Sequence, residues 1–192
     1  MTRILIVNGN PKPASFCAAL ADAYEAGARS AAHEVERIDL GALPVDPVLR
    51  TGFTPHEPEE PELTAAREAI GRAQHLVLVW PLWFGDMPAI LKGFLERSLT
   101  MGFAMEEIEK PRFFRPLLTG RSARSIVTMQ MPRLVYRLVY GSAATKLLRR
   151  HILGFVGMSP VRDMVFGGID DAAPGTRAKW LEEVRRLGAA AG

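Results

Sequence analysis

The first segment that could bind a ligand is the polar run from Asn8 to Ser15, which follows the apolar residues 4–7. It lacks the Gly-x-Gly-x-x-Gly pattern of dinucleotide-binding loops and the Gly-Lys-Ser/Thr ending of a P-loop. Ser15 precedes a run rich in helix-forming residues, so it is a candidate N-cap. Because unpaired backbone N–H groups at a helix start attract anions, this segment could bind a phosphate. The alternative is that Ser15 only caps the helix.

A second candidate is the aromatic segment around residues 80–88. Trp80, Trp83 and Phe84 cluster where the clearest apolar run of the chain, residues 75–80, meets a Pro-Leu and a Gly-Asp turn. Aromatic side chains at the end of a buried strand can stack on a planar ligand in a cleft. Two alternatives stay open: the side chains form a packed hydrophobic loop, or they contribute to a dimer interface.

Side chains for acid–base or metal chemistry are sparse. The four histidines, His33, His56, His75 and His151, lack metal-ligand spacing, so no metal site is expected. No Gly-x-Ser-x-Gly elbow marks a serine nucleophile. Cys17 is the one cysteine; its place near a helix start could lower the thiol pKa, and the alternative is a small buried residue. This scarcity suits a reaction in which a cofactor supplies the chemistry.

Alternating strands and helices must position these residues. Apolar runs predict five buried strands, at residues 3–7, 33–40, 75–80, 122–129 and 161–166. Helices are predicted at residues 16–24, 63–72, 88–97, 176–187 and 134–156, the last interrupted near Gly141 and Ser142. This order is typical of an α/β fold, a doubly wound five-stranded parallel sheet with helices on both faces. The loops at residues 8–15, 81–88 and 129–132 should then meet beyond the carboxyl ends of the strands.

Length and composition set wider bounds. A chain of 192 residues fits one domain, residues 1–192. The segment from residue 41 to 62 carries five prolines and is long for a connection, which favours a functional loop or a flexible excursion. One cysteine, a short N-terminal apolar run and no apolar stretch near ~18 residues lead us to expect a cytoplasmic protein that is not integral to a membrane.

Positive charge is concentrated in one stretch. Residues 110–150 carry ten Lys or Arg and no Asp or Glu, in a chain of net charge +3. Such a stretch usually forms a solvated face; the other interpretations are a phosphate-bearing ligand or an anionic surface. Nucleic acid is not expected as a partner, because no nucleic-acid-binding motif accompanies the charge.

The segment Pro81–Arg97, Pro-Leu-Trp-Phe-Gly-Asp-Met-Pro-Ala-Ile-Leu-Lys-Gly-Phe-Leu-Glu-Arg, carries a family resemblance. It resembles the strand-end Pro-Leu-x-aromatic loop and the following Pro-Ala-Ile-Leu-Lys-Gly of the flavodoxin-like NAD(P)H:quinone oxidoreductases. That family includes bacterial drug-activity modulators and ancillary subunits of potassium efflux systems. The similarity spans nearly the whole chain, and residues 8–16 resemble the family's His-x-x-x-x-Ser-Phe-Asn pattern more loosely.

The resemblance implies a flavodoxin-like fold, FAD or FMN as cofactor, NADPH or NADH as electron donor, and a homodimer. The implied activity is hydride transfer to a quinone-like acceptor in two half-reactions that share one pocket. The alternative is a flavin-binding regulatory or ancillary subunit of a membrane transport system, a peripheral transporter partner with incidental reductase activity.

The resemblance also assigns site residues. The cofactor-binding residues would be Asn10, Ser15, Phe16 and Cys17 near the phosphates, Pro81, Leu82, Trp83 and Phe84 around the ring, and Thr128, Met129 and Gln130 at its pyrimidine end. Phe84 and Tyr136 would face the reacting molecules as catalytic residues. Phe103 and Met105 would lie in the acceptor pocket, with Phe103 contributed across the dimer interface.

Several positions depart from the family pattern. Asn10 stands where the family often has His, and Cys17 where Asn is common. Met129-Gln130 replaces a Gly-Gly pair, so the Gln130 amide is a candidate donor to the carbonyl edge of the flavin. Met105 replaces a Tyr of well-known members, so the acceptor preference does not transfer.

The basic stretch flanks the loop at residues 128–130. We therefore expect a preference for NADPH, with Arg133 or Arg137 contacting its 2′-phosphate, because the guanidinium fork suits phosphate oxygens. The alternative is that both arginines point to solvent.

Overall fold

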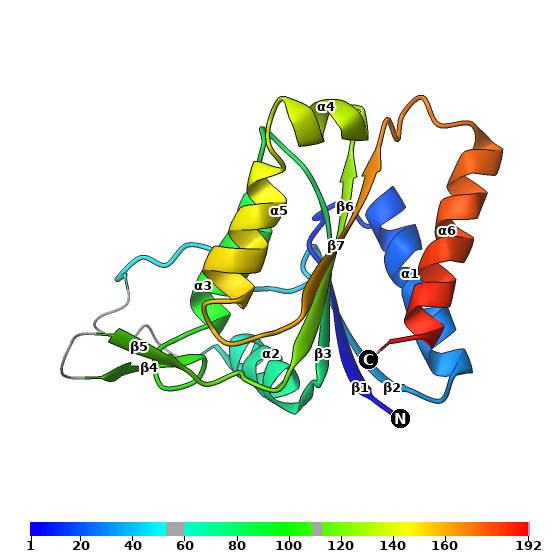
Figure 1. The fold of residues 1–192 in the computed structure, drawn as a ribbon. Helices are drawn as coiled ribbons and strands as arrows, with labels where there is room; N and C mark the ends of the chain where they lie inside the picture. The colour runs from blue at the N-terminus through cyan, green and yellow to red at the C-terminus, as the bar shows by residue number, and fades with distance from the viewer. Residues whose placement is uncertain (53–59, 109–112, 192) are drawn as a thin grey trace.

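The computed structural model describes residues 1–52, 60–108 and 113–191. A five-stranded parallel sheet in the order β2-β1-β3-β6-β7 forms its centre (Figure 1). The strands are β1 (Arg3–Asn8), β2 (Glu34–Asp39), β3 (His75–Pro81), β6 (Ser122–Met129) and β7 (Val161–Gly167). The α/β class and the five predicted strands are confirmed.

Helices cover both faces of the sheet, each over its own hydrophobic core (Figure 1). One face carries α1 (Phe16–Ser30) and α6 (Pro174–Ala189). The other carries α2 (Pro61–Arg72), α3 (Ala89–Ser98) and α5 (Ala143–Leu147). All seven residues of β3 are buried between the two layers, which is why this strand reads as a continuous apolar run.

The helices α1 and α6 approach each other closely at two glycines. A Cβ atom on Gly27 would lie 1.8 Å from the carbonyl oxygen of Arg185, and one on Gly188 would lie 2.1 Å from that of Tyr24. Any side chain at these positions would push the helices apart. This contact fixes α1, and with it the loop that precedes α1, against the sheet.

Two segments differ from the sequence-based expectation. The chain forms an antiparallel ribbon of β4 (Met105–Ile108) and β5 (Phe113–Pro116), which was not predicted. The predicted helix over residues 134–156 is divided into α4 (Arg133–Leu138), α5 and a π-helical turn η1 (Leu148–Leu153). The expected interruption is present, because Gly141 and Ser142 both have positive φ, 59° and 55°.

Parts of two expectations lie outside the described residues. Residues 53–59 of the proline-rich segment and Lys110 and Arg112 of the basic stretch are among them. The helix α2 begins at Pro61, two residues before the predicted helix start.

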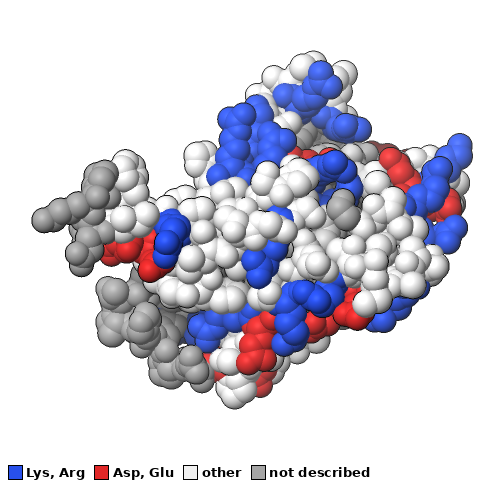
Figure 2. All heavy atoms as spheres, turned by 60° about the horizontal axis from the view of Figure 1, so that its bottom comes forward, with Lys and Arg blue, Asp and Glu red and all other residues white. Residues whose placement is uncertain are grey.

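Charged side chains of both signs lie together along the lower and right edges of the face shown in Figure 2. Arg72 pairs with Glu36 at 2.8 Å, and Arg185 pairs with Glu182 at 2.8 Å. No helix in the described part of the chain is both long enough and apolar enough to cross a membrane.

Candidate functional site

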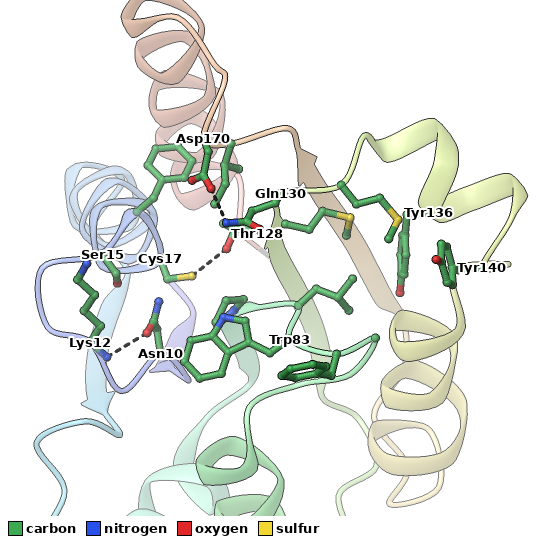
Figure 3. Close-up of a pocket in the computed structure, with 18 of the residues that line it drawn as sticks. Asn10, Lys12, Ser15, Cys17, Trp83, Thr128, Gln130, Tyr136, Tyr140 and Asp170 are labelled. Carbon is green, nitrogen blue, oxygen red and sulfur yellow. Dashed lines mark hydrogen bonds between the residues drawn. The ribbon is translucent and has the colours of Figure 1, made fainter.

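A cavity of about 970 Å³ opens at the carboxyl edge of the sheet, where the loops after β1, β3, β6 and β7 meet (Figure 3). The strand order reverses between β1 and β3, and ligands of doubly wound sheets bind at such a switch point. Cofactor sites typically measure ~300–1,000 Å³. The predicted site residues that line the cavity are Asn10, Ser15, Phe16, Cys17, Pro81, Leu82, Trp83, Phe84, Thr128, Met129, Gln130 and Tyr136.

The loop between β1 and α1 forms one wall, and its side chains fold back onto its own backbone. The Asn8 Oδ1 atom accepts from the Asn10 N–H at 3.2 Å, and the Asn10 Oδ1 atom accepts from the Lys12 N–H at 3.0 Å. Ser15 Oγ accepts from the Ala18 N–H at 3.2 Å, so Ser15 caps α1 as one alternative expected. The cap leaves other first-turn N–H groups free for an anion, so phosphate binding stays a prediction.

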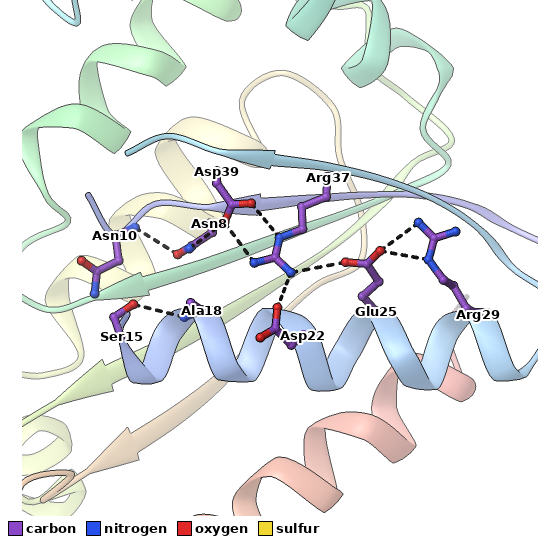
Figure 4. Close-up of polar contacts among 9 residues, drawn as sticks. All are labelled: Asn8, Asn10, Ser15, Ala18, Asp22, Glu25, Arg29, Arg37 and Asp39. Atoms are coloured by element: carbon purple, nitrogen blue, oxygen red, sulfur yellow. Dashed lines mark hydrogen bonds and ion pairs between the residues drawn. The ribbon is translucent and has the colours of Figure 1, made fainter. Parts of the chain in front are cut away.

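A network of ionic contacts behind this wall holds the loop in place (Figure 4). Asn8 Nδ2 donates to Asp39 Oδ1 at 2.9 Å. The guanidinium of Arg37 binds Asp39 at 2.9 Å and reaches Asp22 on α1 at 2.5 Å. These contacts tie β2, the end of β1 and α1 together, so the wall of the cavity is part of a rigid scaffold.

Cys17 lies at the base of the same wall and is buried. Its Sγ atom is 3.2 Å from Thr128 Oγ1 on β6. Burial raises the pKa of the Cys17 thiol, and the hydrogen bonds with Thr128 and Asn10 oppose the rise only in part. The interpretation of a lowered thiol pKa is therefore wrong, and that of a small buried residue holds, because the thiol is removed from water.

The aromatic wall is a tight turn after β3. Backbone bonds of 2.8 and 3.0 Å join Trp83 to Asp86 in both directions, and Phe84 and Gly85 between them have φ of 48° and 83°. Two successive positive φ angles define a type I′ turn, which glycine or asparagine normally occupies. A phenylalanine there stores strain, and strain of this kind is concentrated at functional sites.

The turn holds the Phe84 side chain fully out in solvent at the mouth of the cavity, with Trp83 about half exposed beside it. The alternative of a packed hydrophobic loop is therefore wrong for Phe84 within one chain. Trp80 is different: it is completely buried, and its Nε1–H donates to Ser125 Oγ at 3.0 Å. Trp80 belongs to the core because its strand position points it away from the cavity.

The opposite wall comes from the loop after β6 and from α4. Gln130 Nε2 donates to Asp170 Oδ2 at 2.5 Å, which orients the side-chain amide. Tyr136 is buried, and its Oη atom accepts from the Thr145 N–H at 3.2 Å. Tyr136 and Tyr140 stand together at this side of the cavity, across from Ser15 and Lys12 (Figure 3).

The sequence of the chain assigns it to a family. Residues 2–187 match the family described as having the flavodoxin-like fold. The chain belongs to this family. A solved structure similar to it, Smu.1420 of Streptococcus mutans UA159, is 30% identical with a TM-score of 0.83, covering 98% of this chain and 100% of that one.

Two curated members carry names that state an activity. YcaK of Escherichia coli K12, an uncharacterized NAD(P)H oxidoreductase, is 30% identical over 139 residues, 66% of this chain and 69% of that protein. An FMN-dependent NADH:quinone oxidoreductase of Nitratidesulfovibrio vulgaris DP4 is 26% identical over 207 residues, 97% of this chain and 98% of that protein. With a Penicillium crustosum relative the match spans only 57% of that protein's length. The resemblance to NAD(P)H:quinone oxidoreductases is confirmed at the level of the family, which supports an oxidoreductase enzyme.

Sequence reasoning missed a fourth wall, made by the loop after β7 and the start of α6. Ile169, Asp170 and Arg177 line the cavity there. Arg177 Nη2 donates to the Ile169 carbonyl at 2.5 Å, and its guanidinium carbon lies 5.9 Å from the ring centre of Phe16. The part of this wall that directly follows β7 could have been predicted, because ligands bind at strand ends and this rule applies to β7 as it does to β1 and β3.

Lys12, Met131, Tyr140 and Ala143 also line the cavity and were not predicted. Phe103 and Met105, which were predicted, do not line it. Phe103 packs near α2, 3.5 Å from where a Cβ atom of Gly71 would lie, and Met105 begins the β4–β5 ribbon. The expected role of these two residues in the acceptor pocket needs a second copy of the chain, and it stays a prediction.

The donor set suits a phosphate-bearing aromatic cofactor. The Arg177 Nε atom is buried and has no hydrogen-bond partner in the described part of the chain, although the residue lines the cavity. Lys12 adds a second cation beside the start of α1. Phe84 presents an open aromatic face at the other end. Within the described residues, no group of three His, Cys, Asp or Glu could hold a metal ion.

Proposed function

We propose that this chain binds FAD or FMN in the cavity and transfers hydride from NAD(P)H to a quinone-like acceptor in two steps. The observation that carries the proposal is that one cavity joins an end with two cationic side chains, Lys12 and Arg177, to an open aromatic end at Phe84. The names of the Escherichia coli and Nitratidesulfovibrio vulgaris relatives support the same class of reaction.

The phosphate end lies between α1 and α6. The first-turn N–H groups of α1 and the side chains of Lys12 and Arg177 bind the flavin phosphate in this proposal. Phosphate oxygens would satisfy the buried Arg177 Nε–H, which lacks a described partner. The aromatic ring of Phe16, below the guanidinium, holds Arg177 in this orientation.

The ring end lies between the turn after β3 and the loop after β6. When bound, the flavin accepts hydride from reduced nicotinamide and passes it to the acceptor. Leu82 and Trp83 hold the ring edge, and the Gln130 amide, fixed by Asp170, faces the carbonyl edge where negative charge develops. Phe84 and Tyr136 then orient the nicotinamide and the acceptor in turn.

Tyr136 can also donate a hydrogen bond. Its Oη atom already accepts from the Thr145 N–H, and no described residue accepts from its O–H. The hydroxyl is thus left to hydrogen-bond an oxygen of the acceptor at the cavity wall.

We also infer a cytoplasmic homodimer. Phe113 and Phe114 are exposed on the β4–β5 ribbon, which projects from the body of the molecule in Figure 1. Exposed apolar side chains of this size favour contact with a second copy. No contact in the described part of the chain favours the alternative of a transporter's ancillary subunit.

The proposal is tested by flavin binding. The purified chain should be yellow, or become so when flavin is added, and the cofactor released by heat is identified as FAD or FMN by chromatography. If neither flavin binds more tightly than ~10 μM, about −7 kcal/mol, the proposal fails. NAD(P)H oxidation with a soluble quinone then tests the reaction itself.

A further inference from the structure

The segment at residues 133–150, α4 with α5 and the start of η1, forms a surface that we call the platform. Its apolar side chains are unusually exposed: Leu134 63%, Leu138 68% and Val139 73%. Val135, Tyr140 and Leu147 are also exposed. A contiguous group of this kind on a chain marks a site of interaction.

The reason for the exposure lies in how α4 is anchored. Tyr136 alone of the α4 side chains is buried, and its hydroxyl accepts from Thr145 on α5. Leu134 and Leu138 are four residues apart, so they lie on one side of the helix, as do Val135 and Val139. The helix therefore uses one inward side chain for folding and turns its aliphatic side chains to the outside.

The charge of the platform has one sign. It carries Arg133, Arg137, Lys146, Arg149 and Arg150, and no Asp or Glu occurs from residue 133 to 150. Arg149 pairs with Asp163 at 3.2 Å; the other four cations have no ion pair within the described residues. In Figure 2 blue spheres with few red neighbours stand at the upper edge, on the side where Figure 1 places α4 and α5.

The platform is continuous with the mouth of the cavity. Tyr136, Tyr140 and Ala143 line the cavity, and Tyr140 is also half exposed on the platform. The exposed Phe84 also lines the cavity. The platform side of the opening is therefore apolar and cationic.

We propose that the platform docks on an anionic lipid bilayer. Leucine and valine side chains enter the headgroup region while arginines and lysines contact lipid phosphates, as in amphipathic interfacial segments. Tyr140 has the amphipathic ring that favours the membrane–water interface. Two platforms packed face to face fit less well, because they would bring their unpaired cations together.

Docking would place the cavity mouth at the surface where apolar quinones are dissolved. Uptake of a quinone from the bilayer rests on the proposed function, whereas lipid binding does not. The substrate class that it adds is a quinone with a long apolar tail, taken from the bilayer rather than from water.

The test measures binding to vesicles by flotation. Vesicles of phosphatidylcholine alone are compared with vesicles that contain phosphatidylglycerol, at low and high salt. We expect at least tenfold more protein on the anionic vesicles, and a loss of most of this binding at high salt. Equal binding to both vesicle types, or no binding to either, overturns the proposal.

Variants locate the surface. Leu138→Gln and Leu134→Gln should each lower vesicle binding at least threefold, whereas Val48→Gln, at an exposed aliphatic residue outside the platform, should not. If Leu138→Gln instead converts a dimer to a monomer in sedimentation, and the wild type ignores vesicles, the platform joins two copies and the lipid proposal is wrong.

Kinetics separate the inference of a bilayer-dissolved acceptor from the proposed function. Leu138→Gln should reduce a short water-soluble quinone at the wild-type rate but lose most of its rate with a long-chain quinone in anionic vesicles. An equal loss of rate with both quinones overturns the inference that the acceptor is taken from the bilayer. If the wild type reduces neither quinone, the proposed function fails, and the flotation result still decides lipid docking.

Discussion

The two edges of the central sheet use their polar groups in opposite ways. At the amino edge, His75 is buried, with Nε2 3.1 Å from Tyr24 Oη and Nδ1 2.7 Å from Ser122 Oγ. At the carboxyl edge, a buried N–H of Arg177 has no described partner and Phe84 extends into solvent. His75 at the amino edge has both ring nitrogens paired within the fold and so stabilises it, whereas Arg177 and Phe84 at the carboxyl edge line the cavity and keep binding capacity for a ligand. Substitutions at the amino edge should therefore change the free energy of unfolding, and substitutions at the carboxyl edge should change flavin affinity.

The largest expected effect is at the amino edge and depends on pH. Burial, with the nearby cations Arg124 and Arg162, lowers the pKa of His75 from 6.5 to about 4. Between these values the unfolded chain binds a proton that the folded chain does not, so the free energy of unfolding falls as pH drops from 6.5 to 4. The loss should be about 3 kcal/mol.

Denaturant unfolding at several pH values measures this effect. His75→Gln removes the titrating group, so the variant should lose about 3 kcal/mol less than the wild type between pH 6.5 and 4. An equal loss in both proteins would mean that His75 does not carry the acid sensitivity. Flavin affinity at pH 7 should be the same in both.

At the carboxyl edge, Arg177→Ala should weaken flavin binding about ten- to a hundredfold, since charge-assisted hydrogen bonds contribute roughly 1.5–3 kcal/mol. Fluorescence titration with FMN and FAD measures the affinity. The matched control is Arg185→Ala on the same helix, whose side chain pairs with Glu182 and does not line the cavity. Similar affinities in the two variants would remove Arg177 from the site.

A smaller effect concerns the nicotinamide donor. Arg133 and Arg137 are exposed beside Tyr136 and do not line the cavity. If either contacts the 2′-phosphate, Arg133→Ala or Arg137→Ala should lower kcat/KM for NADPH about tenfold and leave that for NADH unchanged. Equal kcat/KM values of the wild type for NADPH and NADH, at low and high salt, would contradict a contact of either arginine with the 2′-phosphate.

The smallest effect concerns the strained turn. Phe84→Ala should lower quinone reduction about fivefold, because an aromatic contact contributes on the order of 1 kcal/mol beyond its area. Phe84→Gly should lose the same activity. Its free energy of unfolding should nevertheless be about 1 kcal/mol higher than that of Phe84→Ala, because glycine tolerates the positive φ. Full activity in either variant would place Phe84 outside the reaction.

The predictability of each region follows from how local its signal is. The strand β3 was found because its residues from Leu76 to Trp80 are apolar without interruption, whereas β4 and β5 are four-residue strands of mixed polarity that form a separate two-stranded sheet. Trp80 and Trp83 are close in sequence, yet Trp80 is core and Trp83 lines the cavity, since Trp80 is a buried residue of β3 and Trp83 lies in the turn after the strand. Arg177 reaches the site only because α6 packs beside α1, a contact that no local pattern encodes.

The cavity walls come from four loops, the first near Asn10 and the last near Asp170 and Arg177, so they exist together only when nearly the whole chain has folded. A flavin held by all four would bind the native state and not its partly folded forms. At a hundredfold excess over its Kd, such a ligand would add ~2.7 kcal/mol to the free energy of unfolding. The supply of cofactor in the cell would then set how long the chain resists proteolysis, so the abundance of the protein should follow flavin levels.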